Sequence, residues 1–175
     1  MPQSEIVSFQ PATGEELWRG NICDVDEAVA RARAAFPGWA SRPVANRMEM
    51  MRRFANEVRA AADDFAELIA RETGKPLWEA KTEVEAVINK VEISISAYME
   101  RTGQKKLDSA LGGSAALRHK PHGIMAVLGP YNFPAHLPNG HIVPALIAGN
   151  TVLFKPSEKT PAVGALLVEC FHRAG

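Results

Sequence analysis

The chain has 175 residues, of which 46% are hydrophobic, enough to bury one sizeable core in a single domain. Its 20 basic and 20 acidic side chains cancel, so no net field gathers nucleic acid or acidic membrane, and we expect neither as a partner. The N-terminus has no basic start followed by an apolar run, and no segment approaches the roughly 20 apolar residues of a membrane span. These features predict a cytoplasmic protein.

Three helices are predicted in the first hundred residues. The first begins after Asp24, a capping residue, and weakens at Pro37–Gly38. The second covers 43–73 and carries a stripe of Met and Phe side chains, which we interpret as core packing rather than a ligand site. The third covers about 77–99. Its part at 91–97 also alternates with the period of a strand, but the length of the pattern favours a helix.

A glycine-rich segment follows at 102–120, where the helical pattern disappears. Gly103, Gly112 and Gly113 indicate two strands joined by a glycine turn. The strands of such a hairpin have unpaired edges, so we expect a partner chain to cover or pair with them.

From Gly123 onward the pattern becomes that of an α/β sheet. A short apolar run at 124–128 predicts a strand buried on both faces, and a helix at 136–148 follows it. A second strand at 151–154 precedes a last helix that opens at Thr160–Pro161. This order predicts two parallel strands with a right-handed crossover.

Polar residues gather where these two strands end. Tyr131 and Asn132 follow the first strand, and Lys155 and Glu158 follow the second, at the ends where α/β sheets collect ligands. The Asn132 amide could donate to an oxyanion, although turn geometry alone would also explain an asparagine here. Lys155 and Glu158 could bind the hydroxyls of a ribose, and the carboxylate would then favour NAD by repelling the 2′-phosphate of NADP. The alternative for this pair is a solvated salt bridge at a turn.

The cysteines and histidines form no recognisable catalytic or metal-binding pattern. Cys23 and Cys170 are far apart in the sequence, and no two of the five histidines have the i, i+4 spacing of a helical zinc site. Cys170 falls on an apolar helix face, where it would act as a small hydrophobic residue. We therefore expect no metal and no disulfide, and we assign neither cysteine as a nucleophile.

The motifs around the strand ends resemble the NAD(P)-dependent aldehyde dehydrogenase superfamily. In chain order they are Gly129-Pro-Tyr-Asn-Phe-Pro134, Pro144-Ala-Leu-Ile-Ala-Gly-Asn150, Lys155-Pro-Ser-Glu158 and Thr160-Pro161. The resemblance includes Arg71-Glu-Thr-Gly-Lys-Pro76 and extends over the rest of the chain. The segments 131–141 and 80–103 most resemble those of family members that act on the semialdehyde of a succinylated amino acid.

This resemblance implies an α/β fold, the N-terminal part of a Rossmann-like parallel-sheet cofactor domain with three preceding helices and a β-hairpin. Residues 1–101 would form the helical N-terminal part of the NAD-binding domain, 102–120 an oligomerisation hairpin, and 121–175 the first βαβα part of the NAD-binding sheet. We do not expect the first hairpin that is usual in the family. Family members are much longer, so we expect a fragment without the catalytic domain, its nucleophilic cysteine and its general-base glutamate.

The resemblance also implies a role for each candidate residue. Asn132 would help to bind the oxyanion. The cofactor, NAD, would be contacted by Leu128, Gly129, Tyr131, Asn132, Lys155, Ser157 and Glu158. The substrate tunnel would be lined by Phe133, His136, Leu137 and Gly140. Many relatives have a bulky aromatic residue in place of Gly140, so the glycine would leave room for a larger, polar substrate.

The expected function is thus NAD-dependent oxidation of a small-molecule aldehyde by a longer parent protein, a homo-oligomer assembled through 102–120. The fragment itself is expected to be inactive. Two alternatives stay open: an enzyme that acts on a different semialdehyde, and a non-catalytic assembly module that pairs through the hairpin.

Overall fold

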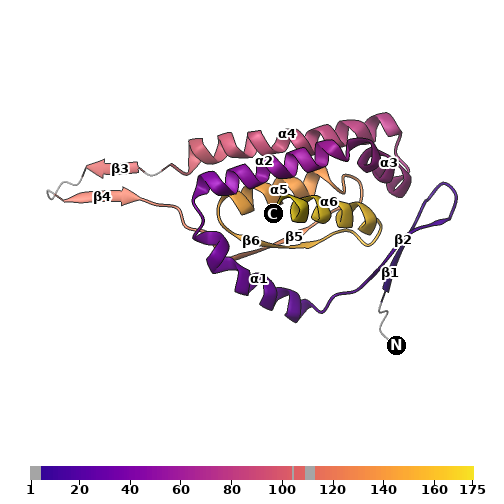
Figure 1. Ribbon diagram of the computed structural model, residues 1–175, viewed down its shortest axis with the longest axis horizontal. Coiled ribbons are helices and arrows are strands. Elements are labelled where there is room, and N and C mark those ends of the chain that lie inside the picture. The colour runs from indigo at the N-terminus through magenta and orange to yellow at the C-terminus, as the bar shows by residue number, and fades with distance from the viewer. Residues whose placement is uncertain (1–4, 104, 109–112) are drawn as a thin grey trace.

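The computed structural model describes residues 5–103, 105–108 and 113–175. The helices and the central parallel sheet lie in successive layers, and one β-hairpin stands at each side of them (Figure 1). Within the described residues, no helix is both long and apolar enough to cross a membrane.

An antiparallel hairpin opens the chain. Strand β1, Glu5–Phe9, pairs with β2, Glu16–Asn21, and Gly14 takes a left-handed conformation with φ of 75° in the turn between them. The expectation that this hairpin is missing is therefore wrong. Its strands lie at one side of the molecule and most of their residues are exposed or half-buried, so they lack the strong apolar alternation that reveals a buried strand.

Four helices follow, rather than the three expected. Helix α1, Val25–Ala40, is capped by Asp24, whose carboxylate accepts from the main-chain N–H of Glu27 over 2.9 Å. The expected second helix is divided into α2, Val44–Ala60, and α3, Ala62–Thr73. Ala61 departs from helical geometry, with φ of −101° and ψ of 15°, although neither glycine nor proline marks the position. Helix α4, Leu77–Arg101, completes the set.

The core lies among α2, α3, α4 and the two helices near the C-terminus, while α1 has no buried residue. The Met and Phe stripe belongs to it, since the side chains of Met48, Met51, Phe54 and Phe65 are buried. The ring of Phe54 stacks on that of Phe171, with ring centroids 3.7 Å apart. The interpretation of this stripe as core packing is confirmed.

The glycine-rich segment forms a second antiparallel hairpin. Strand β3, Lys105–Asp108, pairs with β4, Ser114–Leu117, and the hairpin projects away from the helices (Figure 1). The two predicted strands are confirmed, while residues 104 and 109–112, including Gly112, lie outside the described residues.

The central sheet has two parallel strands, β5, Ile124–Leu128, and β6, Thr151–Lys155. Helix α5, His136–Ile147, joins them, and α6, Pro161–Ala174, follows β6. The predicted order of these four elements is confirmed, but the expectation that β5 is buried on both faces is wrong. Val127 is 5% exposed and Leu128 is 74% exposed, because one face of this narrow sheet borders an open cavity.

Candidate functional site

The two polar loops leave the sheet side by side. Leu128 and Lys155 are partners in the register of the parallel strands, and the main-chain N–H of Gly129 donates to the oxygen of Lys155 over 2.9 Å. Farther out, the Lys159 ammonium lies 5.3 Å from the ring centroid of Tyr131, a distance typical of a cation–π contact. The structure thus brings the two predicted clusters together at one edge of the sheet.

Lys155 and Glu158 form an ion pair with an Nζ–Oε2 distance of 3.4 Å. Both side chains are exposed, so the pair contributes little to stability. The main-chain N–H of Glu158, followed by Lys155, lowers the pKa of the Glu158 carboxyl, which is therefore ionised at neutral pH. Ser157 is buried between them, and its Oγ accepts from the main-chain N–H of Lys159 over 3.2 Å.

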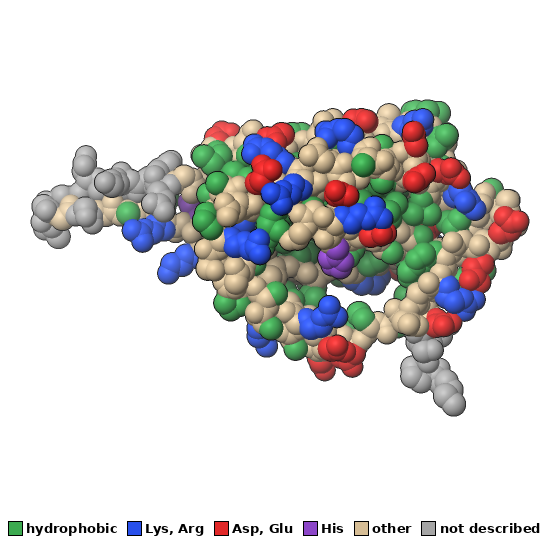
Figure 2. Space-filling model, viewed as in Figure 1, with side chains coloured by type: hydrophobic (Ala, Val, Ile, Leu, Met, Phe, Trp, Pro, Cys, Tyr) green, Lys and Arg blue, Asp and Glu red, His purple; other side chains and the backbone are tan. Residues whose placement is uncertain are grey.

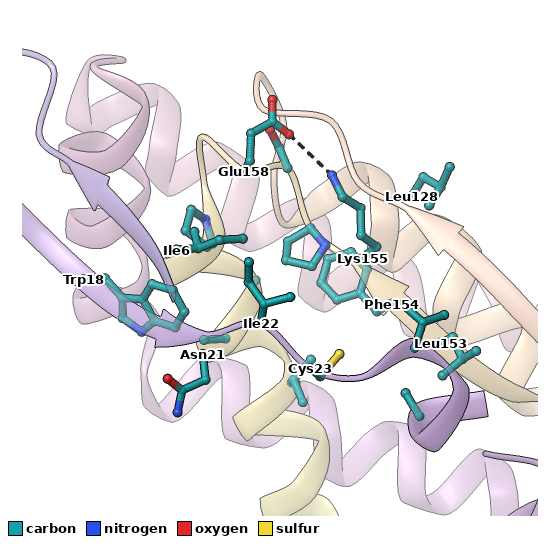
Figure 3. Close-up of a pocket in the computed structure, with 18 of the residues that line it drawn as sticks. Ile6, Trp18, Asn21, Ile22, Cys23, Leu128, Leu153, Phe154, Lys155 and Glu158 are labelled. Atoms are coloured by element: carbon teal, nitrogen blue, oxygen red, sulfur yellow. Dashed lines mark hydrogen bonds and ion pairs between the residues drawn. The ribbon is translucent and has the colours of Figure 1, made fainter. Parts of the chain in front are cut away.

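The pair stands at the edge of a cavity of about 770 Å³ (Figure 3). Its lining includes Leu128, Lys155, Ser157 and Glu158 from the predicted cofactor residues, but not Gly129, Tyr131 or Asn132. Apolar side chains of the first hairpin, the sheet, α1 with the segment before it, and α6 line the rest of the cavity. The opening lies between the main body and the segment that joins β2 to α1 (Figure 2). The volume of the cavity falls within the range of roughly 300–1,000 Å³ for small-molecule sites.

The loop that carries Asn132 is held by a lysine that the sequence did not single out. Lys75 Nζ donates to the main-chain oxygen of Asn132 over 2.8 Å, and it lies 4.3 Å from the ring centroid of Phe133. The Asn132 side chain itself is exposed, and no hydrogen bond to it is found within the described part of the chain. Its amide can therefore donate to a ligand. Lys75 belongs to the motif Arg71-Glu-Thr-Gly-Lys-Pro76, which resembles the family, but the sequence alone indicated no role for it.

Two buried carboxylates occupy the N-termini of the helices that follow the strands. Glu83 Oε1 accepts from the main-chain N–H groups of Ala135 and His136, over 3.0 and 3.1 Å, at the start of α5. Glu72 accepts from Ala162 and Val163, over 2.9 and 2.8 Å, at the start of α6. Both helix starts are common phosphate sites in nucleotide-binding sheets. Here these N–H groups already have protein acceptors, so they are not free to bind a phosphate.

The two carboxylates differ in their charge environment. Glu83 Oε2 accepts from Lys75 Nζ over 2.8 Å, so a buried ion pair supports the start of α5. For Glu72, burial raises the pKa of the carboxyl, and the Ser8 hydroxyl together with the N–H groups of Val163 and Ala162 opposes this shift only in part. The short α3–α4 turn, with Gly74 at φ of 76°, places Glu72 and Lys75 so that each supports one polar loop.

The predicted substrate residues lie on the Asn132 loop and on the first turns of α5. Phe133 and Leu137 are 36% and 42% exposed. His136 is half-buried, and its Nδ1 has no hydrogen-bond partner within the described residues. Gly140 faces α4, because a Cβ built on it would lie 3.6 Å from Lys90 Cε.

Neither cysteine has the surroundings of a nucleophile. Cys170 is buried in the core, and burial raises the pKa of its thiol. Cys23 is exposed and lines the cavity, whose lining does not include Asn132. Among the described residues, no group of three or more His, Cys, Asp or Glu side chains could hold a metal ion.

Comparison with known proteins explains why these loops carry the recognised motifs. The family model described as "Aldehyde dehydrogenase family" matches residues 1–175. The chain belongs to the aldehyde dehydrogenase family. The N-succinylglutamate 5-semialdehyde dehydrogenase of Novosphingobium aromaticivorans is 72% identical to it over 175 residues, which is 100% of this chain and 37% of the relative. The enzyme of the same name from Salmonella typhi is 56% identical over 168 residues, 94% of this chain and 34% of the relative. This aldehyde dehydrogenase chain thus spans about a third of the length of these relatives.

Solved structures of the family share the fold. The aldehyde dehydrogenase of Brucella melitensis biovar abortus superposes with a TM-score of 0.91 at 28% identity, covering 98% of this chain and 36% of that one. The NADP-dependent glyceraldehyde-3-phosphate dehydrogenase of Bacillus halodurans, solved with NADP, gives 0.91 at 27% identity, covering 98% and 38%. The NAD-dependent benzaldehyde dehydrogenase of Corynebacterium glutamicum gives 0.89 at 26% identity, with the same coverage. The expected Rossmann-like α/β class is therefore confirmed.

Proposed function

We propose that this chain supplies the oxyanion donor and part of the cofactor site of an N-succinylglutamate 5-semialdehyde dehydrogenase of arginine catabolism. The full-length enzyme, in which this segment forms the N-terminal part, would oxidise the semialdehyde to N-succinylglutamate with NAD. The observation that carries the proposal is the 72% identity to the Novosphingobium enzyme over the whole chain. An exposed Asn132 amide and an ion pair beside a cavity of ligand size are consistent with it.

Asn132 has the chemistry of an oxyanion donor. When a thiolate adds to an aldehyde, the carbonyl oxygen gains a negative charge, and a fixed amide N–H stabilises this charge without a proton transfer. Lys75 and Glu83 hold the main chain of this loop, so the backbone that carries the amide is fixed in place before the substrate arrives. The thiolate would come from a part of the full-length enzyme outside this chain, because neither Cys23 nor Cys170 has suitable surroundings.

Lys155 and Glu158 have the arrangement of a ribose-binding pair. An ammonium group and an ionised carboxylate at 3.4 Å can together bind two neighbouring hydroxyls. The negative charge of Glu158 would repel a 2′-phosphate, which supports NAD over NADP as cofactor. The solved relatives include enzymes of both kinds, so this choice rests on Glu158. When bound, NAD would accept the hydride from the aldehyde carbon.

The test of this function is NADH formation by the full-length enzyme with a panel of semialdehydes. We expect the highest kcat/KM for N-succinylglutamate 5-semialdehyde and a loss of about 10²–10³ in kcat for Asn132→Ala. The control is Asn89→Ala on α4, an exposed asparagine. Better turnover of an unsuccinylated semialdehyde would show that the proposed substrate is wrong. An unchanged kcat in Asn132→Ala would show that Asn132 is not the oxyanion donor. The 175-residue chain alone should form no NADH.

We also propose that the β3–β4 hairpin joins subunits. The hairpin projects from the body, and Ala115, Ala116 and Leu117 of β4 are exposed. Strand edges left open in this way favour pairing with a second chain. We expect the full-length enzyme to be a homo-oligomer that dissociates when residues 102–120 are replaced by a short glycine–serine linker. Light scattering after size exclusion measures this, and an unchanged mass after the replacement would contradict it.

A further inference from the structure

Lys90 of α4 lies beside Gly140 of α5. A Cβ placed on Gly140 would be 3.6 Å from Lys90 Cε, an ordinary van der Waals distance. Lys90 is half-buried, so its alkyl stem covers the surface of α5 at the position where the glycine has no side chain. A bulky residue at 140 would compete with this stem for the same space.

Lys90 has no carboxylate partner within the described part of the chain. Among the other described lysines, Lys75 pairs with Glu83, Lys81 with Asp63, and Lys155 with Glu158, whereas the exposed Lys120 and Lys159 have no such pair. A half-buried cation without an anionic partner can bind the carboxylate of a ligand with little competition from the protein.

The position of Lys90 relative to Asn132 follows from the contacts between α4 and α5. Lys75 Nζ contacts both Glu83 Oε2 and the main-chain oxygen of Asn132, each over 2.8 Å. The Asn132 main chain therefore lies beside the turn of α4 that carries Glu83. One turn along, the main-chain oxygen of Val87 accepts from Asn139 Nδ2 over 3.0 Å. Lys90 is seven residues beyond Glu83 on the same face, a rise of about 10 Å.

This separation matches the proposed substrate. N-succinylglutamate 5-semialdehyde has two carboxylates, and the one at the end of the succinyl group is eight covalent bonds from the aldehyde carbon. An extended chain of that length spans about 10 Å. An aldehyde carbon placed at Asn132, with the rest of the substrate extended along α4, would put the succinyl carboxylate within reach of the Lys90 ammonium.

We propose that Lys90 is a specificity-determining residue that binds the terminal carboxylate of the succinyl group. The role of Gly140 is then to leave room for the Lys90 stem as well as for the substrate. This inference rests on the proposed function, because it assumes that the aldehyde binds at Asn132. It adds to that function the recognition of the end of the substrate remote from the reaction.

The test compares two aldehydes in the full-length enzyme, N-succinylglutamate 5-semialdehyde and the uncharged hexanal. For Lys90→Met we expect KM for the succinylated substrate to rise about tenfold with kcat changed less than about twofold, and no change for hexanal. Lys90→Glu should raise KM further, and Lys90→Arg should largely restore it. The matched control is Lys81→Met on the same helix, which removes only an exposed ion pair.

Calorimetric binding of the product N-succinylglutamate gives a second readout that does not depend on turnover. Affinity should fall about tenfold in Lys90→Met, while the thermal midpoint stays close to that of Lys81→Met. Equal changes for hexanal and for the succinylated substrate, or none for either, would overturn the proposal for Lys90. If the unmodified enzyme oxidises hexanal but not the succinylated substrate, the proposed function fails instead, and Lys90 has no succinyl group to bind.

Discussion

Lys75 donates a hydrogen bond of 2.8 Å to the main-chain oxygen of Asn132, a residue 57 positions farther along the chain. The same ammonium group pairs with the buried Glu83 carboxylate and lies over the ring of Phe133. One charged group thus fixes the loop that carries Asn132 and the start of α5. The position of the proposed amide donor therefore depends on a residue that would not itself touch the substrate.

Replacing Lys75 by Met in the full-length enzyme should therefore lower kcat, by about 100-fold, because a displacement of the donor by about 1 Å has this effect. Loss of one partner of a buried ion pair should also destabilise the fold by about 3–5 kcal/mol. Combining Lys75→Met with Glu83→Gln removes the unpaired buried charge. The double variant should regain stability but not kcat. If kcat returns together with the thermal midpoint, Lys75 has only a structural role.

An epistasis measurement separates this effect from the role of Asn132 itself. In an Asn132→Ala background, Lys75→Met should lower kcat little further, since there is no amide left to orient. An equal, additive loss in both backgrounds would show that Lys75 acts by another route. Lys81→Met, which removes an exposed ion pair of α4, serves as control.

Glu158→Gln should raise kcat/KM for NADP relative to that for NAD, by about tenfold, because it removes a negative charge beside the proposed ribose position. Glu158 is exposed, so we expect no change in the thermal midpoint. Steady-state kinetics with both cofactors measures the ratio. Glu49→Gln, at an exposed i,i+4 pair with Arg53, is the control. If Glu158→Gln leaves the ratio of kcat/KM for NADP to that for NAD unchanged, other residues determine the cofactor preference.

The sequence predicted those parts of the fold that depend on local patterns. The order β5, α5, β6, α6 followed from short apolar runs and their Gly and Pro boundaries, and both polar loops followed from that order. The break at Ala61 was missed because neither a glycine nor a proline interrupts the apolar stripe there. The first hairpin was missed because its exposed strands have little apolar alternation.

The support of the site could not be predicted in the same way, because it depends on contacts between distant residues. Glu72 and Glu83 lie on helices whose pattern predicts only an apolar face, and a carboxylate on such a face has no local explanation. Their partners are main-chain N–H groups 52 to 91 positions away. Buried charges of this kind are stable only when paired or hydrogen-bonded, so each indicates a partner without identifying it.

Gly164→Ala should displace the loop that carries Lys155, Ser157 and Glu158. A Cβ at Gly164 would lie 2.5 Å from Pro156 Cβ, which is too close unless Pro156 moves. Because Pro156 lies between Lys155 and Ser157 in the sequence, its movement would displace both neighbours. We expect a loss of about 1–3 kcal/mol in unfolding free energy and a several-fold higher KM for NAD. Gly38→Ala in α1 is the matched control, because nothing lies within 4 Å of its Cβ position. That change should stabilise the chain by about 0.5–1 kcal/mol. A neutral Gly164→Ala would show that the loop tolerates the shift.

The raised pKa of Glu72 should be measurable from the pH dependence of the unfolding free energy. Its pKa is raised in the folded chain, so folding strengthens proton binding at this carboxyl. The resulting stabilisation is fully present below the unfolded-state pKa and is lost as the pH rises through the folded-state pKa. The unfolding free energy of the wild type minus that of Glu72→Gln should therefore fall with rising pH, beginning near the ordinary value of 4.5. Urea unfolding of the 175-residue chain at several pH values measures this difference, with Glu67→Gln on the exposed side of α3 as control. A difference that grows with pH would mean that the Ser8 hydroxyl and the N–H groups of Val163 and Ala162 stabilise the ionised carboxylate more than burial destabilises it.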